Sequence, residues 1–362
     1  MKKMKAGRIP FAVDAFRKAR RVAGFFGVPG SGKSALVREG AEQISRRLSA
    51  PVVVEELHLA SMSEVDVRGF LIPEGNHSRF TKPPFWEAVE SSPNGILFLD
   101  EFPQAPHEVQ KAVAPLLLDR RVGNHTLPDG WSVVVAGNRL EDNAGANSLL
   151  SHILNRIAYI EIEPDPAAWL AWAFKAGIDP TLVAFAKLRP GTVFDDKPPV
   201  DDAPWCSGRS LHALSDLGTA VGGLRDLLMT SEDNRAMAQG LVGQAAVHEL
   251  VSMIATADKL PDFDAIMKNP DTVKLPDTLD GKYLAVTLVA LRAASHTDSS
   301  DEALRRNDEE LRKAAAYLQR YEFNLTLVGI MGLLQRRPAV SKHVTQWIVK
   351  NQKLFGEYRM FM

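Results

Sequence analysis

A lysine, a serine and three glycines lie close together near the start of the chain, in the stretch GVPGSGKS at residues 27–34. Their spacing matches G-x-x-x-x-G-K-[ST] between a short apolar run and a helical stretch, although an ordinary glycine-rich turn is the alternative. Glycines let the backbone point successive N–H groups at phosphate oxygens, and the helix starting near Lys33 adds its positive end. We expect Lys33 to reach the β- and γ-phosphates and the Ser34 hydroxyl to ligate Mg²⁺. The predicted phosphate-binding residues are Gly27, Pro29, Gly30, Ser31, Gly32, Lys33, Ser34 and Ala35.

Two acidic residues end another apolar run, ILFLDEF at 96–102. Asp100 is suited to hold Mg²⁺ through water, and Glu101 is suited to polarise an attacking water as general base. The run WSVVVAGN ends at Asn138, whose side-chain amide would orient that water. An asparagine at this place is also a frequent helix cap or turn residue. Together these side chains predict a site for hydrolysis of a metal-bound nucleoside triphosphate.

Five short apolar runs must position these side chains. Continuous valine, isoleucine, leucine and phenylalanine are typical of strands buried on both faces of a parallel sheet. Helical periodicity lies between the runs, so the pattern predicts an α/β fold, a five-stranded parallel sheet with helices on both sides. The predicted strands are residues 22–27, 52–59, 95–100, 131–138 and 157–163.

The second half of the chain has a different pattern. From about Pro164 onward the sequence is helical, with an irregular connector rich in proline and aspartate at 188–210. We expect a nucleotide-binding domain at 1–164, a helical domain at 165–296 and a helical C-terminal extension at 297–362.

Composition limits the function. The 43 lysines and arginines balance 44 aspartates and glutamates, so no global positive field indicates a nucleic-acid protein, although basic stretches occur at 1–5 and 17–21. The single cysteine, Cys206, and scattered histidines argue against disulfides and structural metal sites. No apolar run approaches the roughly 20 residues of a membrane helix, so we expect a cytoplasmic protein without membrane contact.

The motifs and their order resemble the AAA+ ATPases, with Walker A at 27–34, Walker B at 96–101 and sensor 1 at Asn138. The segment SHILNRIAYIEI at 151–162 resembles the junction that carries the arginine finger, and CSGRSLHAL at 206–214 resembles the start of the sensor 2 helix. The resemblance implies ATP as the nucleotide, a catalytic role for Arg156 and Arg209, and a helical lid at 165–296. It also implies a homo-oligomeric ring, usually a hexamer, because the finger reaches the ATP of a neighbouring subunit.

Two insertions resemble the MoxR branch, also called the dynein-related group. The segment 63–95 is similar to the helix-2 insertion, a hairpin facing the pore of the ring, and 119–131 is similar to the β-hairpin before sensor 1. The resemblance is dense over 22–164 and faint beyond about residue 230. Gly208 stands where the family has a proline before the sensor 2 arginine.

The resemblance implies a ring ATPase that remodels or activates a protein client, often one with a von Willebrand A domain. The alternative is a nucleic-acid motor of a restriction, phage or mobile-element system, in which GNHSRFTK at 75–82 would track a strand. A nucleotide-gated scaffold is a third reading, which Lys33, Asp100, Glu101 and Arg156 argue against. Near-neutral charge favours the protein client.

Overall fold

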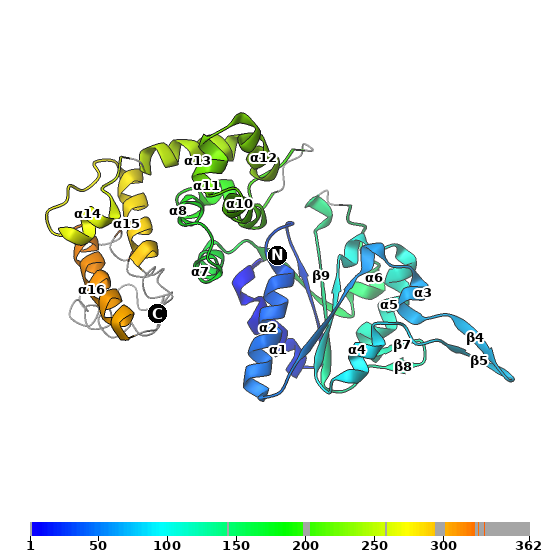
Figure 1. Cartoon of the computed structure of the whole chain (residues 1–362). Coiled ribbons are helices and arrows are strands. Elements are labelled where there is room, and N and C mark those ends of the chain that lie inside the picture. Colours follow the sequence, from blue (N-terminus) through cyan, green and yellow to red (C-terminus); the bar gives the residue numbers. More distant parts are fainter. Residues whose placement is uncertain are drawn as a thin grey trace. The chain divides into compact units, whose positions relative to one another are not determined.

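The computed structural model describes residues 2–142, 145–197, 203–257, 259–293 and 301–322, together with 325 and 329. The chain forms two compact units, one of Met1–Asp165 with Phe194–Asp202 and one of Pro166–Val193 with Ala203–Met362. The first unit holds the sheet, and the described part of the second is helical (Figure 1). The chain returns to the first unit at Phe194, which no pattern in the sequence predicts. The domain limits at 164 and 296 stay predictions.

The main sheet has six parallel strands in the order β1-β10-β2-β9-β6-β3. All five predicted strands are present, but the expected number of five is wrong, because β1 pairs with the outer side of β10. A strand of two residues is too short to show a pattern in the sequence. The bounds are Met4–Lys5 for β1, Val22–Phe26 for β2, Val53–His58 for β3, Gly95–Asp100 for β6, Trp131–Gly137 for β9 and Ile157–Glu163 for β10.

Helices cover both faces of this sheet (Figure 1). On one face, α1 (Ile9–Lys18) and α2 (Lys33–Leu48) pack on side chains that include Phe25 and Phe98. On the other, α4 (Trp86–Ser91) and α5 (His107–Asp119) pack on a core that includes Phe26. Strands buried on both faces explain the continuous apolar runs of the sequence.

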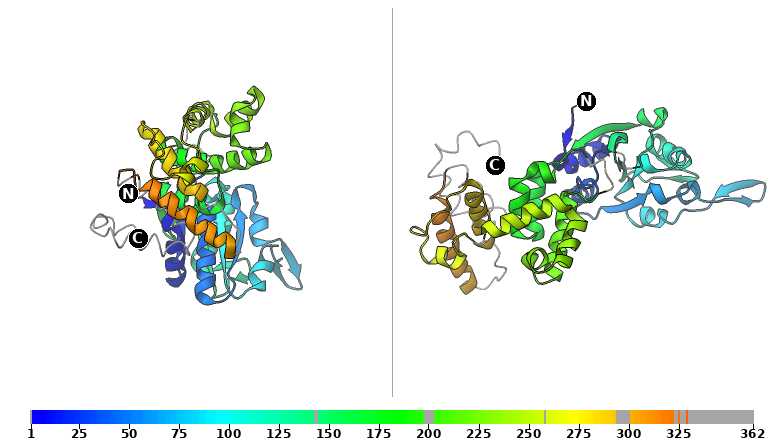
Figure 2. Two further views of the ribbon diagram at one scale, coloured as in Figure 1. Left: turned by 60° about the vertical axis from the view of Figure 1, so that its left-hand side comes forward. Right: turned by 90° about the horizontal axis from the view of Figure 1, so that it is seen from above.

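Two antiparallel hairpins interrupt the α/β alternation. The first joins β4 (Leu71–Glu74) to β5 (His77–Phe80), lies between α3 (Glu64–Arg68) and α4, and extends away from the body of the first unit (Figure 2). The second joins β7 (Arg121–Val122) to β8 (His125–Thr126). Both lie where the sequence predicts insertions, at 63–95 and 119–131.

The second unit consists of helices in the described residues. One of its cores joins α15 to α16 through Val286, Tyr317 and Leu318. Cys206 is buried before α10, and burial, with a smaller contribution from Glu249, raises the pKa of its thiol to about 12. The helices are α7 (Pro166–Ala176), α8 (Pro180–Leu188), α9 (Pro190–Val193), α10 (Gly208–Ala220), α11 (Leu224–Met229), α12 (Glu232–Val242), α13 (Gln244–Ala257), α14 (Phe263–Lys268), α15 (Leu279–Ala293) and α16 (Asp301–Leu318).

The predicted C-terminal extension at 297–362 includes α16. Most of the extension beyond Glu322 lies outside the described residues. None of the helices in the described ranges combines the length and the apolar character that a membrane crossing requires.

Candidate nucleotide-binding and catalytic site

The predicted phosphate loop connects the end of β2 to the start of α2. Gly30 and Gly32 have φ angles of 77° and 84°, a left-handed conformation that favours glycine. The turn is closed by Ser31, whose hydroxyl donates to the Val28 carbonyl at 2.8 Å. Helix α2 then begins at Lys33, so its first N–H groups face the loop. The sequence GVPGSGKS therefore adopts the strand–loop–helix geometry that binds phosphates in other proteins.

The Lys33 side chain is buried inside this loop, with only 8% of its surface exposed. Its ammonium donates to the carbonyls of Gly27 at 2.8 Å and Val28 at 3.0 Å. It also lies 3.4 Å from the side-chain oxygen of Asn138, which follows β9. The contact joins two predicted site residues that are 105 positions apart in the chain. A single positive charge is thus held where the loop meets the end of the neighbouring strand.

Ser34 and Asp100 form a second contact between predicted site residues. The Ser34 hydroxyl donates to Oδ2 of Asp100 at 2.6 Å, and the backbone N–H of Glu101 donates to Oδ1 at 2.9 Å. A hydroxyl and a carboxylate in contact are oxygen ligands of the kind that Mg²⁺ prefers, so the donor set fits this ion. Glu101 is exposed and has a φ of 55°, which turns the chain as β6 ends.

Asn138 is followed by a buried ion-pair network that the sequence analysis missed. Arg139 is 4% exposed, and its guanidinium contacts Asp142 at 2.7 Å and Asp196 at 3.3 Å. Its backbone N–H also donates to Asp142 at 2.7 Å. Burial acts to lower the pKa of Arg139, but the two carboxylates outweigh burial and raise it. The network fixes the turn that presents Asn138; its sequence signal is an arginine and an aspartate three residues apart after a predicted strand.

Glu56 and His58 on β3 lie beside Asp100, and the sequence analysis did not single them out either. His58 is the register partner of Asp100, and ligand atoms of all three residues lie within 4.8 Å of one another. Glu56 also forms an ion pair with Arg38. The alternation in VVVEELHL, which puts Glu56 and His58 on one face of the strand, is the signal that would have found them.

Arg156 lies at the amino end of the parallel strands, opposite the carboxyl end that carries the phosphate loop. It comes just before β10, whose first residue pairs with Val22 at the start of β2. Its Nη1 donates to the carbonyl of Ala114 in α5 at 2.8 Å. The five residues of β2, at about 3.3 Å each, span on the order of 15 Å between this end and the phosphate loop. Arg156 and the loop of the same chain are therefore separated by the length of the sheet.

Arg209 belongs to the second unit, in the first turn of α10. Ser207 caps this helix by accepting from the backbone N–H of Ser210. The glycine at 208 is explained by Trp169: a Cβ there would lie 2.5 Å from the indole nitrogen. The helix start matches the sequence analysis, and the role of Arg209 stays a prediction.

Comparison with known proteins bears on the identity of the first unit. Residues 25–157 match the family model described as AAA domain (dynein-related subfamily). The search of curated proteins found no match.

Solved structures with similarity to the chain include two RuvB mutants from Thermotoga maritima. They share 16% and 14% sequence identity, cover 73% of this chain and 75% and 74% of their own, and have TM-scores of 0.37 and 0.31. The closed state of Hsp104 with ATPγS and FITC casein shares 18% identity over 63% of this chain and 44% of its own, with a TM-score of 0.35. Likenesses this distant carry no argument about what the chain acts on.

The family match and the geometry agree on the first unit. The matched residues include the phosphate loop, the strand that ends at Asp100, and Asn138. The parallel sheet and its flanking helices form the P-loop fold that the motifs require. Residues 25–157 therefore form a nucleotide-binding domain that is similar to the AAA domain of the dynein-related subfamily.

Proposed function

We propose that the chain binds ATP with Mg²⁺ at the phosphate loop and hydrolyses it there, with each predicted site residue in the following role. Lys33 holds the β- and γ-phosphates, and Ser34 and Asp100 hold the ion. Glu101 takes the proton of the attacking water, and Asn138 orients that water. The observation that carries the proposal is the pair of contacts Lys33–Asn138 and Ser34–Asp100, which join three separate segments at one edge of the sheet.

The proposed active assembly is a homo-oligomeric ring, taken as a hexamer from the family resemblance. In it Arg156 stabilises the transition-state charge at the ATP of a neighbouring copy. Its position supports this role, because Arg156 and the phosphate loop of its own chain lie at opposite ends of the parallel strands. Arg209 is proposed to sense the nucleotide from the second unit.

The proposed client is a protein, and a von Willebrand A domain partner is the specific expectation. The β4–β5 hairpin supports this class. Its positive side chains are paired, Arg79 with Glu74 at 2.9 Å and Lys82 with Glu90 at 2.7 Å, which leaves little net charge for a nucleic-acid strand. Next to these pairs, Phe70 and Leu71 are 67% and 60% exposed. Exposed apolar side chains are typical of a surface that contacts another protein.

Mixing of two inactive variants tests the shared site. Arg156→Ala retains an intact phosphate loop, and Lys33→Ala retains an intact arginine. If the arginine acts on a neighbour, each variant alone has little ATPase activity, and an equimolar mixture recovers a measurable part of it. An arginine that acts within its own chain predicts no recovery. The readout is phosphate release at a concentration where sedimentation shows the oligomer.

Capture of partners tests the client class. Glu101→Gln should bind ATP with normal affinity and hydrolyse it about 100-fold or more slowly, which holds the loaded state. The tagged variant is used with ATP and Mg²⁺ in a lysate of the native host, and Lys33→Ala serves as the unloaded control. A protein partner found only with Glu101→Gln supports the proposal. Nucleic acid retained after a high-salt wash, without a stoichiometric protein, favours the alternative motor. Normal hydrolysis by Glu101→Gln would remove Glu101 as the base.

A further inference from the structure

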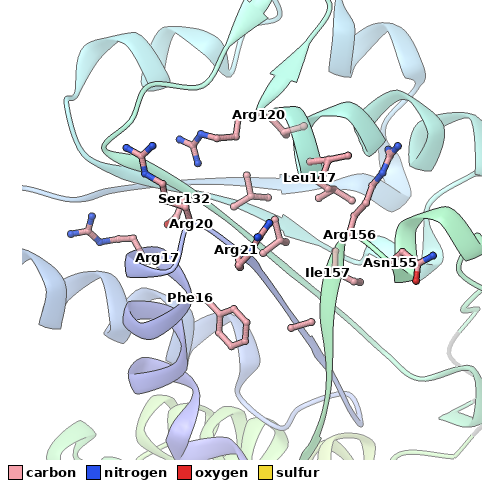
Figure 3. A pocket seen from close by; sticks show the side chains of 15 residues that line it. Phe16, Arg17, Arg20, Arg21, Leu117, Arg120, Ser132, Asn155, Arg156 and Ile157 are labelled. Atoms are coloured by element: carbon pink, nitrogen blue, oxygen red, sulfur yellow. The ribbon is translucent and has the colours of Figure 1, made fainter.

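A pocket lies at the amino ends of the parallel strands, the end of the sheet opposite the phosphate loop. Its volume is about 300 Å³, and 15 residues of the first unit line it (Figure 3). It lies among the end of α1, the end of α5 and the amino ends of β2, β9 and β10. Of the lining residues, only Arg156 and the basic stretch at 17–21 stand out in the sequence, and no motif there predicts a binding site.

Five arginines are among the residues that line this pocket: Arg17, Arg20, Arg21, Arg120 and Arg156 (Figure 3). The lining residues, all within the described chain, include no aspartate or glutamate. An ion pair joins Arg20 to Asp129, outside the pocket lining, at 3.4 Å, and both of these side chains are largely exposed. Burial lowers the pKa of Arg120, and Arg20 lowers it further by repulsion, while Asp129 only partly offsets the two. The arginines therefore repel one another, and a multiply charged anion would relieve this repulsion.

The pocket also holds polar atoms that lack partners in the described part of the chain. Ser132, on β9, is 6% exposed, and its hydroxyl makes no hydrogen bond. The Nε of Arg17 is buried and unpaired as well. A buried polar atom without a partner destabilises a fold, and most buried polar atoms in proteins are paired. The hydroxyl and the guanidinium are donors of the kind that phosphate oxygens accept.

We propose that this pocket is a second anion site, which binds a small molecule carrying two or more linked phosphates. Arg17, Arg21 and Arg120 would hold the phosphate oxygens, and the Ser132 hydroxyl would donate from the interior. Such a ligand supplies several negative charges within the reach of one pocket, which matches several arginines around one volume. The backbone of a nucleic-acid strand spreads its charges along a groove and would call for an extended basic stripe. The site is separate from the phosphate loop of its own chain, so in the monomer it binds its ligand independently of the ATP at that loop.

The probe is inorganic tripolyphosphate, titrated by calorimetry into the full-length chain at a concentration where it is monomeric. The wild-type chain should bind two equivalents, one at each edge of the sheet, and Lys33→Ala should bind one. In the Lys33→Ala background, the pair Arg17→Gln and Arg21→Gln should weaken the remaining equivalent at least 10-fold. Arg8→Gln with Arg46→Gln is the matched control, because it removes the same charge from exposed side chains outside the pocket and should change the affinity less than 2-fold.

Ser132→Ala keeps the test decisive if the arginine variant folds poorly. Since the hydroxyl has no partner among the described residues, its removal should leave the melting temperature unchanged or slightly higher, and still weaken tripolyphosphate binding several-fold. Equal weakening by the control pair would show diffuse attraction only and overturn the proposal. So would the absence of binding to Lys33→Ala, or a single-stranded oligonucleotide that binds this pocket more tightly than tripolyphosphate does.

Discussion

Arg139 and Arg120 lie near opposite ends of the strands of the same sheet, and one is buried while the other is half-buried. Arg139, just after β9, contacts Asp142 and Asp196, and its pKa is raised although burial opposes this. Arg120, at the end of α5, donates to the carbonyls of Pro128 and Trp131 and has Arg20 nearby. Burial and this neighbour lower its pKa. One arginine is neutralised within the chain, and the other belongs to a cluster that is not.

The difference separates a structural arginine from a binding one. A guanidinium that completes its hydrogen bonds to carboxylates of its own chain fixes a turn, and has little left for a ligand. Like-charged guanidiniums around a pocket destabilise the chain without a ligand and favour the binding of an anion there. The carboxyl edge of the sheet thus combines an internally balanced scaffold with a phosphate loop, whereas the amino edge presents unbalanced charge.

The largest effect should come from removing the balanced arginine. Arg139→Met leaves Asp142, with 1% of its side chain exposed, without its partner, and should lower the free energy of unfolding by about 3–5 kcal/mol. Urea denaturation of the full chain, followed by circular dichroism, measures it. Arg139→Met with Asp142→Leu is the matched variant and should recover most of the loss, since it removes the unpaired charge. A loss below about 1 kcal/mol in the single variant would mean that the network does not hold the turn.

A smaller effect is expected from the loop lysine. Lys33→Ala should weaken ATP binding about 100-fold or more, because a charge-assisted contact to the phosphates is lost. Calorimetry with ATP and Mg²⁺ measures the affinity, and Lys18→Ala, an exposed lysine paired with Asp14, is the control. Binding of tripolyphosphate at the amino edge should remain. Unchanged ATP affinity would contradict the phosphate-loop assignment.

The smallest effect is expected from relieving the repulsion at the amino edge. Arg20 has a φ of 54°, a conformation that asparagine tolerates better than most residues, and it lies close enough to depress the pKa of Arg120. Arg20→Asn should stabilise the chain by about 0.5 kcal/mol, since the exposed pair with Asp129 contributes little. The gain is measured by thermal melting at low salt and again in 1 M NaCl. The part due to charge should vanish in high salt, so a gain that is the same at both salts would mean that only the backbone was relieved.

The strands that carry the site were predictable because each is specified by its own run of apolar residues. Continuous apolar runs between helical stretches identified β2, β3, β6, β9 and β10 to within a residue at each end. Strand β1 escaped because its pairing with β10 is decided by tertiary contact and not by two residues of sequence. The return of the chain to the first unit at Phe194 also depends on tertiary contact, since Asp196 contacts Arg139, 57 positions away in the sequence.

The residues of the candidate site were likewise predictable only where a local motif marks them. Lys33, Ser34, Asp100 and Asn138 were found from motifs because each stands at the end of a predicted strand or the start of a helix, and parallel strands bring those ends together. Arg139 and His58 matter through neighbours in space, which the motifs do not describe. The arginines of the pocket come from three segments, and only the pairing of β2, β9 and β10 reveals that they lie at the same end of the sheet.

Cys206 makes the chain unusually convenient for chemical labelling. It is the one cysteine in the sequence, it is buried, and its raised pKa keeps it a thiol at neutral pH, so it reacts slowly with maleimides. A cysteine introduced at Asn76, in the exposed turn of the β4–β5 hairpin, would therefore take nearly all of a fluorescent dye. A dye there would report contact between the hairpin and a client without any further change to the chain.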